Sequence, residues 1–209
     1  MATGEEIKKI YTAMKSVCRE ASQMLIEVGA ELDRHRFKRQ NSQVMWELSK
    51  AVENPAVWLP YFQQMVFISQ LPAKSGRAIG IQILFDDPYS RIDLMFPIVL
   101  CGVMEWTAAH KPVGSNNFFT LCIKANEPRG LESDLPFYRA RFEDGWDCSE
   151  ALGYFLPLVA VEDRAKLVSL VVEPCLKMFD GNLEAARSAV NAVALKPQQF
   201  IGNYSLAEP

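Results

Sequence analysis

Four carboxylates and a tryptophan lie within eight residues of this 209-residue sequence, in the segment from Glu143 to Glu150. Carboxylate oxygens are the ligands that hard cations such as Mg²⁺ and Ca²⁺ prefer, and a carboxyl group can also act as a general acid. The spacing does not match an EF-hand loop, and a short acidic segment beside a glycine is typical of a solvated turn. We therefore expect no metal ion here.

Histidine and cysteine are the other side chains that could act as bases, nucleophiles or ligands. The chain has two histidines, His35 and His110, which excludes a three-histidine metal site. His110 could serve as a base if the fold brought it to a thiol such as Cys148. The five cysteines are odd in number, form no Cys-x-x-Cys pair and follow no secretory leader. These features predict reduced thiols in a cytoplasmic protein.

The motifs of the common nucleotide-binding and hydrolytic enzymes are missing from the sequence. There is no G-x-x-x-x-G-K-[ST] loop, no G-x-G-x-x-G turn, no H-E-x-x-H motif and no G-x-S-x-G elbow. The sequence therefore favours a binding or accessory protein without a cofactor, acting through protein–protein contacts. The alternative is an enzyme with a non-standard site, acid- or metal-dependent around residues 143–150 or using His110.

Charge and hydropathy count against two kinds of partner. Lys and Arg number 22 against 25 for Asp and Glu, a net charge of −3, whereas nucleic-acid-binding proteins are usually basic. The basic residues within 34–39 follow a predicted helix, where cations offset the negative helix end. The longest apolar run, residues 94–104, is shorter than the about 20 residues that span a bilayer. We expect neither nucleic acid nor a membrane as a partner.

The most regular pattern in the chain lies at its N-terminus. Apolar residues recur at steps of three and four between residues 7 and 28, which predicts an amphipathic helix over about residues 4–34. The repeat is close to a heptad, so the stripe either packs on the protein's own sheet or meets a partner helix. We predict a homodimer that uses this helix. The candidate partner-binding residues are Ile7, Ile10, Met14 and Val17.

An antiparallel sheet is predicted for about residues 62–160. Residues 79–85 alternate between apolar and other side chains, as in a strand with one buried face. Residues 92–104 are apolar on both faces, which predicts a central strand that Pro97 forces into a bulge or an edge position. Further strands are expected at residues 62–69, 118–125 and 137–143. Residues 44–52 and 153–161 could be strand or helix.

Two helices are predicted after the sheet, within about residues 162–195. The first, over residues 162–179, is strongly apolar and should lie deep on the sheet with a kink at Pro174. Asn182 should cap the second helix, which Pro197 ends. The chain as a whole predicts one α+β domain, in which the N-terminal helix and two C-terminal helices cover a mainly antiparallel sheet. The predicted core residues include Ile81, Ile83, Leu100, Ile123, Val171 and Leu176.

Overall fold

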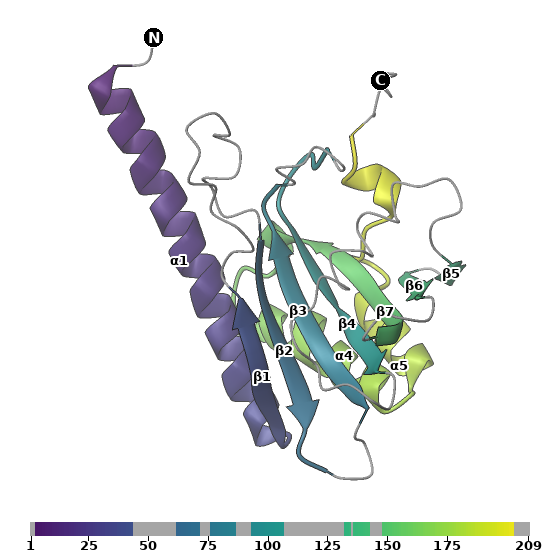
Figure 1. The fold of residues 1–209 in the computed structure, drawn as a ribbon. Coiled ribbons are helices and arrows are strands. Elements are labelled where there is room, and N and C mark those ends of the chain that lie inside the picture. Colours follow the sequence, from purple (N-terminus) through teal and green to yellow (C-terminus); the bar gives the residue numbers. More distant parts are fainter. Residues whose placement is uncertain are drawn as a thin grey trace.

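A seven-stranded antiparallel sheet forms the centre of the protein in the computed structural model (Figure 1). The structure describes residues 3–43, 62–71, 76–86, 93–106, 132–134, 136–142 and 148–202. The strand order is β1-β2-β3-β4-β7-β6-β5, and each neighbouring pair runs antiparallel. Helices precede and follow the sheet in the chain, so the predicted α+β class is confirmed.

The strands fall mostly where the sequence predicts them. They are β1 (Phe37–Gln43), β2 (Phe62–Ser69), β3 (Arg77–Leu84), β4 (Ile98–Trp106), β5 (Glu132–Asp134), β6 (Phe137–Arg141) and β7 (Cys148–Pro157). β4 is central, as predicted, but it begins after Pro97, because proline has no N–H to donate to a neighbouring strand. β1 was not predicted. The segments 44–52 and 118–125 lie outside the described residues.

Both faces of the sheet are buried. On β3, Ile79, Ile81 and Ile83 pack in the core beneath the helices, whereas Leu84 belongs to a second core on the opposite face. Phe200, from the C-terminal end of the described chain, packs in that second core. The predicted one-sided burial of β3 is therefore wrong, because its alternating side chains separate two cores rather than core from solvent.

Four of the predicted core residues are confirmed as buried: Ile81, Ile83, Leu100 and Val171. Leu176 is only partly buried, since its helix presents Cys175, Met178 and Phe179 to the core and leaves Leu176 at the margin. Ile123 lies outside the described residues.

Helix α1 (Gly4–Arg34) begins at a capping box. The Thr3 hydroxyl accepts a hydrogen bond from the Glu6 N–H at 3.3 Å, and the Glu6 carboxylate accepts one from the Thr3 N–H at 2.7 Å. After the helix, Arg36 adopts a left-handed conformation, with φ at 62°, and turns the chain into β1. α1 then lies along β1 and β2 on the helix-covered face of the sheet (Figure 1).

The C-terminal region forms short helical segments. These are η3 (Leu158–Ala160), α3 (Arg164–Leu167), the π-helical turn η4 (Val168–Val172), α4 (Glu173–Phe179), α5 (Leu183–Val190) and η5 (Pro197–Gln199). Those up to α5 cover the same face of the sheet as α1, whereas η5 directly precedes Phe200 of the second core. Asn182 caps α5 as predicted, accepting a hydrogen bond from the Ala185 N–H at 3.2 Å. α5 ends before residue 195 because the chain returns to the sheet, where the Leu195 N–H donates to the Phe155 carbonyl at 2.8 Å.

Pro174 interrupts the helix predicted over residues 162–179, and the interruption takes the form of the π-helical turn η4. Because proline has no N–H, the carbonyl of Leu170 lacks its usual helical donor. The hydroxyl of Tyr154, on β7, donates to that carbonyl at 2.7 Å. The sheet therefore supplies a donor to a carbonyl for which residue 174 has no N–H to offer.

Candidate functional site

The apolar stripe of α1 is divided into a buried half and an exposed half. From Ala21 to Leu32 the stripe packs against β1, β2 and η4. Toward the N-terminus, Ile7, Ile10 and Val17 are 57%, 58% and 43% exposed, and Met14 is half-buried. The four candidate partner-binding residues therefore all belong to the part of the stripe that precedes the buried half.

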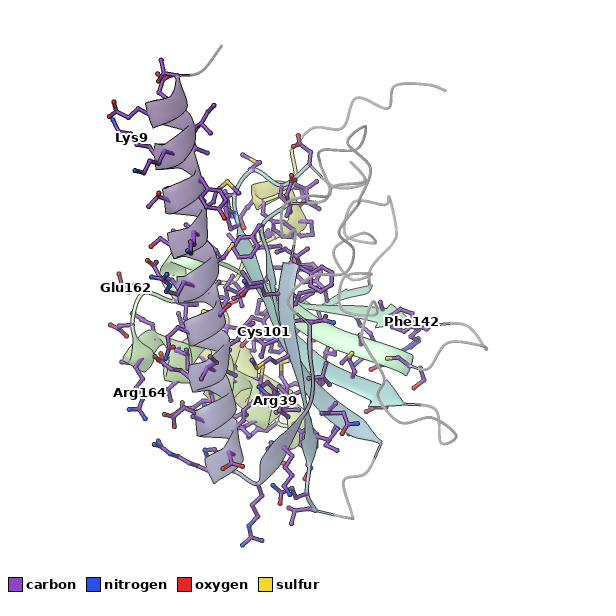
Figure 2. The ribbon with its side chains drawn as sticks, turned by 60° about the vertical axis from the view of Figure 1, so that its left-hand side comes forward. Lys9, Arg39, Cys101, Phe142, Glu162 and Arg164 are labelled. Carbon is purple, nitrogen blue, oxygen red and sulfur yellow. The ribbon has the colours of Figure 1, made fainter. Side chains whose placement is uncertain are left out.

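Gln63, a buried residue of β2, marks the boundary between the two halves. Its side-chain amide donates to the Cys18 carbonyl at 3.2 Å, and its side-chain oxygen accepts from the Ser22 hydroxyl at 3.1 Å. Toward the N-terminus, α1 extends past the end of the sheet, as the position of Lys9 shows in Figure 2. The exposed stripe therefore lies on a projecting helix.

A groove of about 1150 Å³ lies between α1 and the segment that joins β7 to α3. We call it the α1 groove. Figure 2 shows Glu162 and Arg164 beside the C-terminal half of α1, at this groove. Val17 belongs to both the exposed stripe and the groove lining, so the two form one continuous surface. The lining residues are Val17, Glu20, Ala21, Gln23, Met24, Glu27, Ala30, Glu31 and Arg34 of α1, with Phe96, Pro97, Leu158, Val159, Val161, Glu162, Asp163, Arg164 and Leu167.

The lining of the α1 groove combines apolar side chains with an excess of carboxylates. Val159 is 83% exposed, which is high for a large apolar residue. The charged residues of the lining are the acids Glu20, Glu27, Glu31, Glu162 and Asp163 and the bases Arg34 and Arg164. An apolar surface with an acidic rim is chemically suited to a partner that is apolar and basic.

Glu31 joins α1 to α3 at this groove. The Arg164 Nε donates to one Glu31 carboxylate oxygen at 3.0 Å, and the Arg34 guanidinium donates to the other at 2.7 Å. The hydrogen bond from Arg164 is the main cause that lowers the pKa of Glu31 below its ordinary value. Asp163 is also engaged, because its carboxylate caps α3 by accepting from the Lys166 N–H at 2.7 Å. Both arginines of the lining therefore donate hydrogen bonds to the Glu31 carboxylate.

The other candidate residues from the sequence do not form a centre in the part of the chain that the structure describes. His110 and residues 143–147 lie outside it. Glu150 lies on the sheet in ion pairs with the Nε atoms of Arg139, at 3.2 Å, and Arg141, at 3.5 Å. Within the described ranges, no three His, Cys, Asp or Glu side chains are grouped as in a metal centre.

The basic residues after α1 occupy the last turn of the helix, the following turn and the start of β1. Arg34 lies at the α1 groove beside Glu31, Arg36 forms the turn, and Arg39 is exposed on β1. Arg34 in the last helical turn has the position that offsets the negative helix end, as the sequence predicts.

A buried sulfur and hydroxyl cluster lies between the sheet and α4. The Tyr154 hydroxyl is 3.9 Å from the Cys175 sulfur, and Cys101 of β4 interacts with both residues. Burial raises the pKa of the Cys101 thiol and of the Tyr154 hydroxyl well above their ordinary values. A thiol that stays protonated is a poor nucleophile, so Cys101 is not suited to nucleophilic catalysis. Cys18, Cys101 and Cys175 form no disulfide.

The sequence predicted the α1 side of the groove but not the side that the segment after β7 forms. The heptad of α1 indicated Val17, whereas nothing near Val159 or Glu162 distinguishes them from an ordinary loop.

No helix in the described ranges is long and apolar enough to cross a membrane. Comparison with family models, with curated proteins and with solved structures finds no match.

Proposed function

We propose that this chain is a cytoplasmic binding or accessory protein that acts through protein–protein contacts of α1. The observation that carries the proposal is the exposure of Ile7, Ile10 and Val17 on one stripe of a helix. Large apolar side chains aligned on one exposed face are typical of an interaction surface, because their contact with water is unfavourable. The partner that best fits a heptad stripe is another helix, and we propose a homodimer with α1 in the interface.

The chemistry of the α1 groove is also suited to binding. Among the residues that the structure describes, its lining includes no histidine, cysteine, serine, threonine, tyrosine or lysine. Acyl transfer through a serine, threonine or cysteine nucleophile needs one of these groups. Its carboxylates at the rim and its apolar side chains suit recognition of a partner surface.

The test replaces two residues of the exposed stripe in the full chain, as Ile10→Glu with Met14→Glu. Two buried carboxylates would prevent close packing of a partner helix, so the variant should sediment as a folded monomer where the wild type is a dimer at micromolar concentration. The matched control, Thr12→Glu with Ser16→Glu, adds the same charge to the same turns outside the stripe and should remain dimeric.

Circular dichroism and thermal unfolding distinguish a contact surface from a core. If the stripe is a contact surface, the Ile10→Glu, Met14→Glu variant should keep the helix content of the wild type. Its melting temperature should equal that of the wild type diluted until it is monomeric. Unfolding of this variant would instead make the stripe part of the core. Sedimentation of the wild type as a monomer would overturn the homodimer.

A further inference from the structure

The α1 groove has an apolar floor. Of the α1 residues that line it, Val17, Ala21 and Met24 lie nearest the core-facing side of the helix. Leu167 of α3, which also lines the groove, is buried in the same core as Ala21 and Met24. On the opposite side of the groove Val159 is 83% exposed. A partner that covered this surface would remove apolar side chains from water, which favours binding.

Two carboxylates of α1 lie above this floor. At about 100° per residue, Glu20 and Glu27 lie about 80° further round α1 than the floor residues, on the side away from the core. Both accept hydrogen bonds from neutral groups, Glu20 from the Ser16 hydroxyl at 3.1 Å and Glu27 from the Gln23 side-chain amide at 3.2 Å. Neither forms an ion pair with a described residue.

The two arginines of the lining do not neutralise the groove, because both donate to Glu31. Asp163 is engaged as the cap of α3. On the same side of the groove as Asp163, the exposed Glu162 adds a third carboxylate to those of Glu20 and Glu27. The groove therefore combines an apolar floor with three carboxylates that its own arginines leave available to a partner.

Resting on the proposed function, we infer that the α1 groove binds an amphipathic, basic helix of another protein. The apolar stripe of that helix lies on the floor, and its cations face Glu20 and Glu27. The exposed stripe of Ile7 and Ile10 is a separate surface, since it lies about 110° from these carboxylates around α1 and nearer its N-terminus. The groove and the stripe can therefore be occupied at the same time.

The size of the α1 groove suits a helix. Residues 17–34 of α1 line it, a length of about 25 Å, which is that of an 18-residue helix at about 1.5 Å per residue. A helix about 10 Å wide and about 25 Å long has a volume of about 2000 Å³. The groove, of about 1150 Å³, accommodates about half of it. A half-inserted helix buries one face and leaves the other in solvent, as an amphipathic helix requires.

The spacing of the carboxylates gives the partner a recognisable pattern. Glu20 and Glu27 are seven residues apart, which is about two turns and about 10 Å along α1. Lysines seven residues apart on a partner helix lie on one face with the same separation, whereas lysines five residues apart lie about 140° apart around the helix. Two peptides of identical composition can therefore distinguish this pattern from a general attraction between opposite charges.

Peptide binding to the full chain, measured by fluorescence anisotropy, tests the inference. The probe is a labelled 18-residue helical peptide of alanine and glutamine with leucines at steps of three and four and two lysines seven residues apart beside them. It should bind with a micromolar dissociation constant. The matched peptide, with the same leucines and the lysines five residues apart, should bind at least about threefold more weakly, because one of its lysines faces away from the carboxylates.

Variants of the chain locate the binding. Glu20→Lys with Glu27→Lys should weaken binding of the lysine peptide about tenfold, and should bind a peptide with glutamates in place of the two lysines as tightly as the wild type binds the lysine peptide. Glu173→Lys with Glu184→Lys changes the same charge on the C-terminal helices and should bind like the wild type. Val159→Lys should also weaken binding, and its exposure ensures that the fold tolerates the change.

The outcomes separate this inference from the proposed homodimer. Equal binding of the two lysine peptides, or unchanged binding to Glu20→Lys with Glu27→Lys, overturns the inference. Loss of binding in Ile10→Glu with Met14→Glu would place the peptide on the exposed stripe and also overturns it. Conversion of wild-type dimers to monomers by the peptide would make a second copy the occupant of the groove, with the same consequence. A monomeric wild type that binds the lysine peptide overturns the homodimer alone.

Discussion

In the C-terminal half of α1 the apolar stripe is buried against β1, β2 and η4, whereas in the N-terminal half the same stripe is exposed along Ile7, Ile10 and Val17. The heptad repeat does not change between the two halves. What changes is the surface that the sheet offers. A hydrophobic period therefore identifies the face of a helix that will be covered, and the rest of the fold decides what covers it.

The lengths of the elements explain where the division falls. α1 has 31 residues and is about 46 Å long at 1.5 Å per residue. β2 has 8 residues and is about 26 Å long at 3.3 Å per residue. About 20 Å of helix, or about 13 residues, has no β2 strand beside it. This length agrees with the position of Gln63, whose hydrogen bonds reach Cys18 and Ser22 and mark the boundary.

The strongest test of this comparison truncates one apolar side chain in each half. Leu32→Ala should lower the free energy of unfolding by about 2–5 kcal/mol, because it leaves a cavity in the core. Ile10→Ala should lower that of the monomer by less than about 0.5 kcal/mol. Urea denaturation at several protein concentrations measures both, since a loss of association depends on concentration. Equal losses in the monomer would contradict the division of the stripe.

A smaller effect is expected from the helix cap. Thr3→Ala removes the hydroxyl that accepts from the Glu6 N–H, at a cost of about 1 kcal/mol to the local stability of the helix. Because the first turns do not pack on the sheet, amide exchange should become about fivefold faster in residues 4–17 and stay unchanged in residues 21–32. A lower urea midpoint for the whole monomer would show that the projecting half is coupled to the core.

The smallest effect concerns the ion pair that holds the buried half at α3. Arg164 lowers the pKa of Glu31, so the stability from this pair is present above the ordinary carboxyl value of 4.5 and is lost as pH falls through the lowered folded pKa. Arg164→Gln should therefore lower the urea midpoint slightly at pH about 7, with the difference from wild type shrinking toward pH about 3. A difference that is independent of pH would contradict this role.

The regular elements were predictable because their local patterns agree with their tertiary surroundings. α1 has a capping residue, a continuous stripe and a basic last turn, and β3 has strict alternation. β1 was missed because its clearest apolar signal is the buried Phe37, with exposed residues at 38–40, and cations after a helix are equally consistent with a solvated exit. Burial on both faces of β3 was missed because alternation does not reveal the second core.

The candidate site was predictable only in part. The stripe of α1 is a local pattern, so Ile7, Ile10, Met14 and Val17 could be proposed from spacing alone. The opposite side of the α1 groove comes from the chain after β7, and Arg164 meets Glu31 across 133 residues of sequence. No local pattern encodes a contact at that separation, and a single sequence offers no second signal for it.

The Tyr154 hydroxyl donates to the Leu170 carbonyl, so the effect of replacing Tyr154 depends on whether Pro174 has been replaced before it. While Pro174 is present, replacing Tyr154 by phenylalanine removes this buried hydrogen bond, at a cost of about 1 kcal/mol. If Pro174 is replaced by alanine first, residue 174 gains an N–H for the helix, and the loss of the hydroxyl should then cost less. The double variant should therefore be reached with less loss of stability when Pro174 changes first than when Tyr154 changes first.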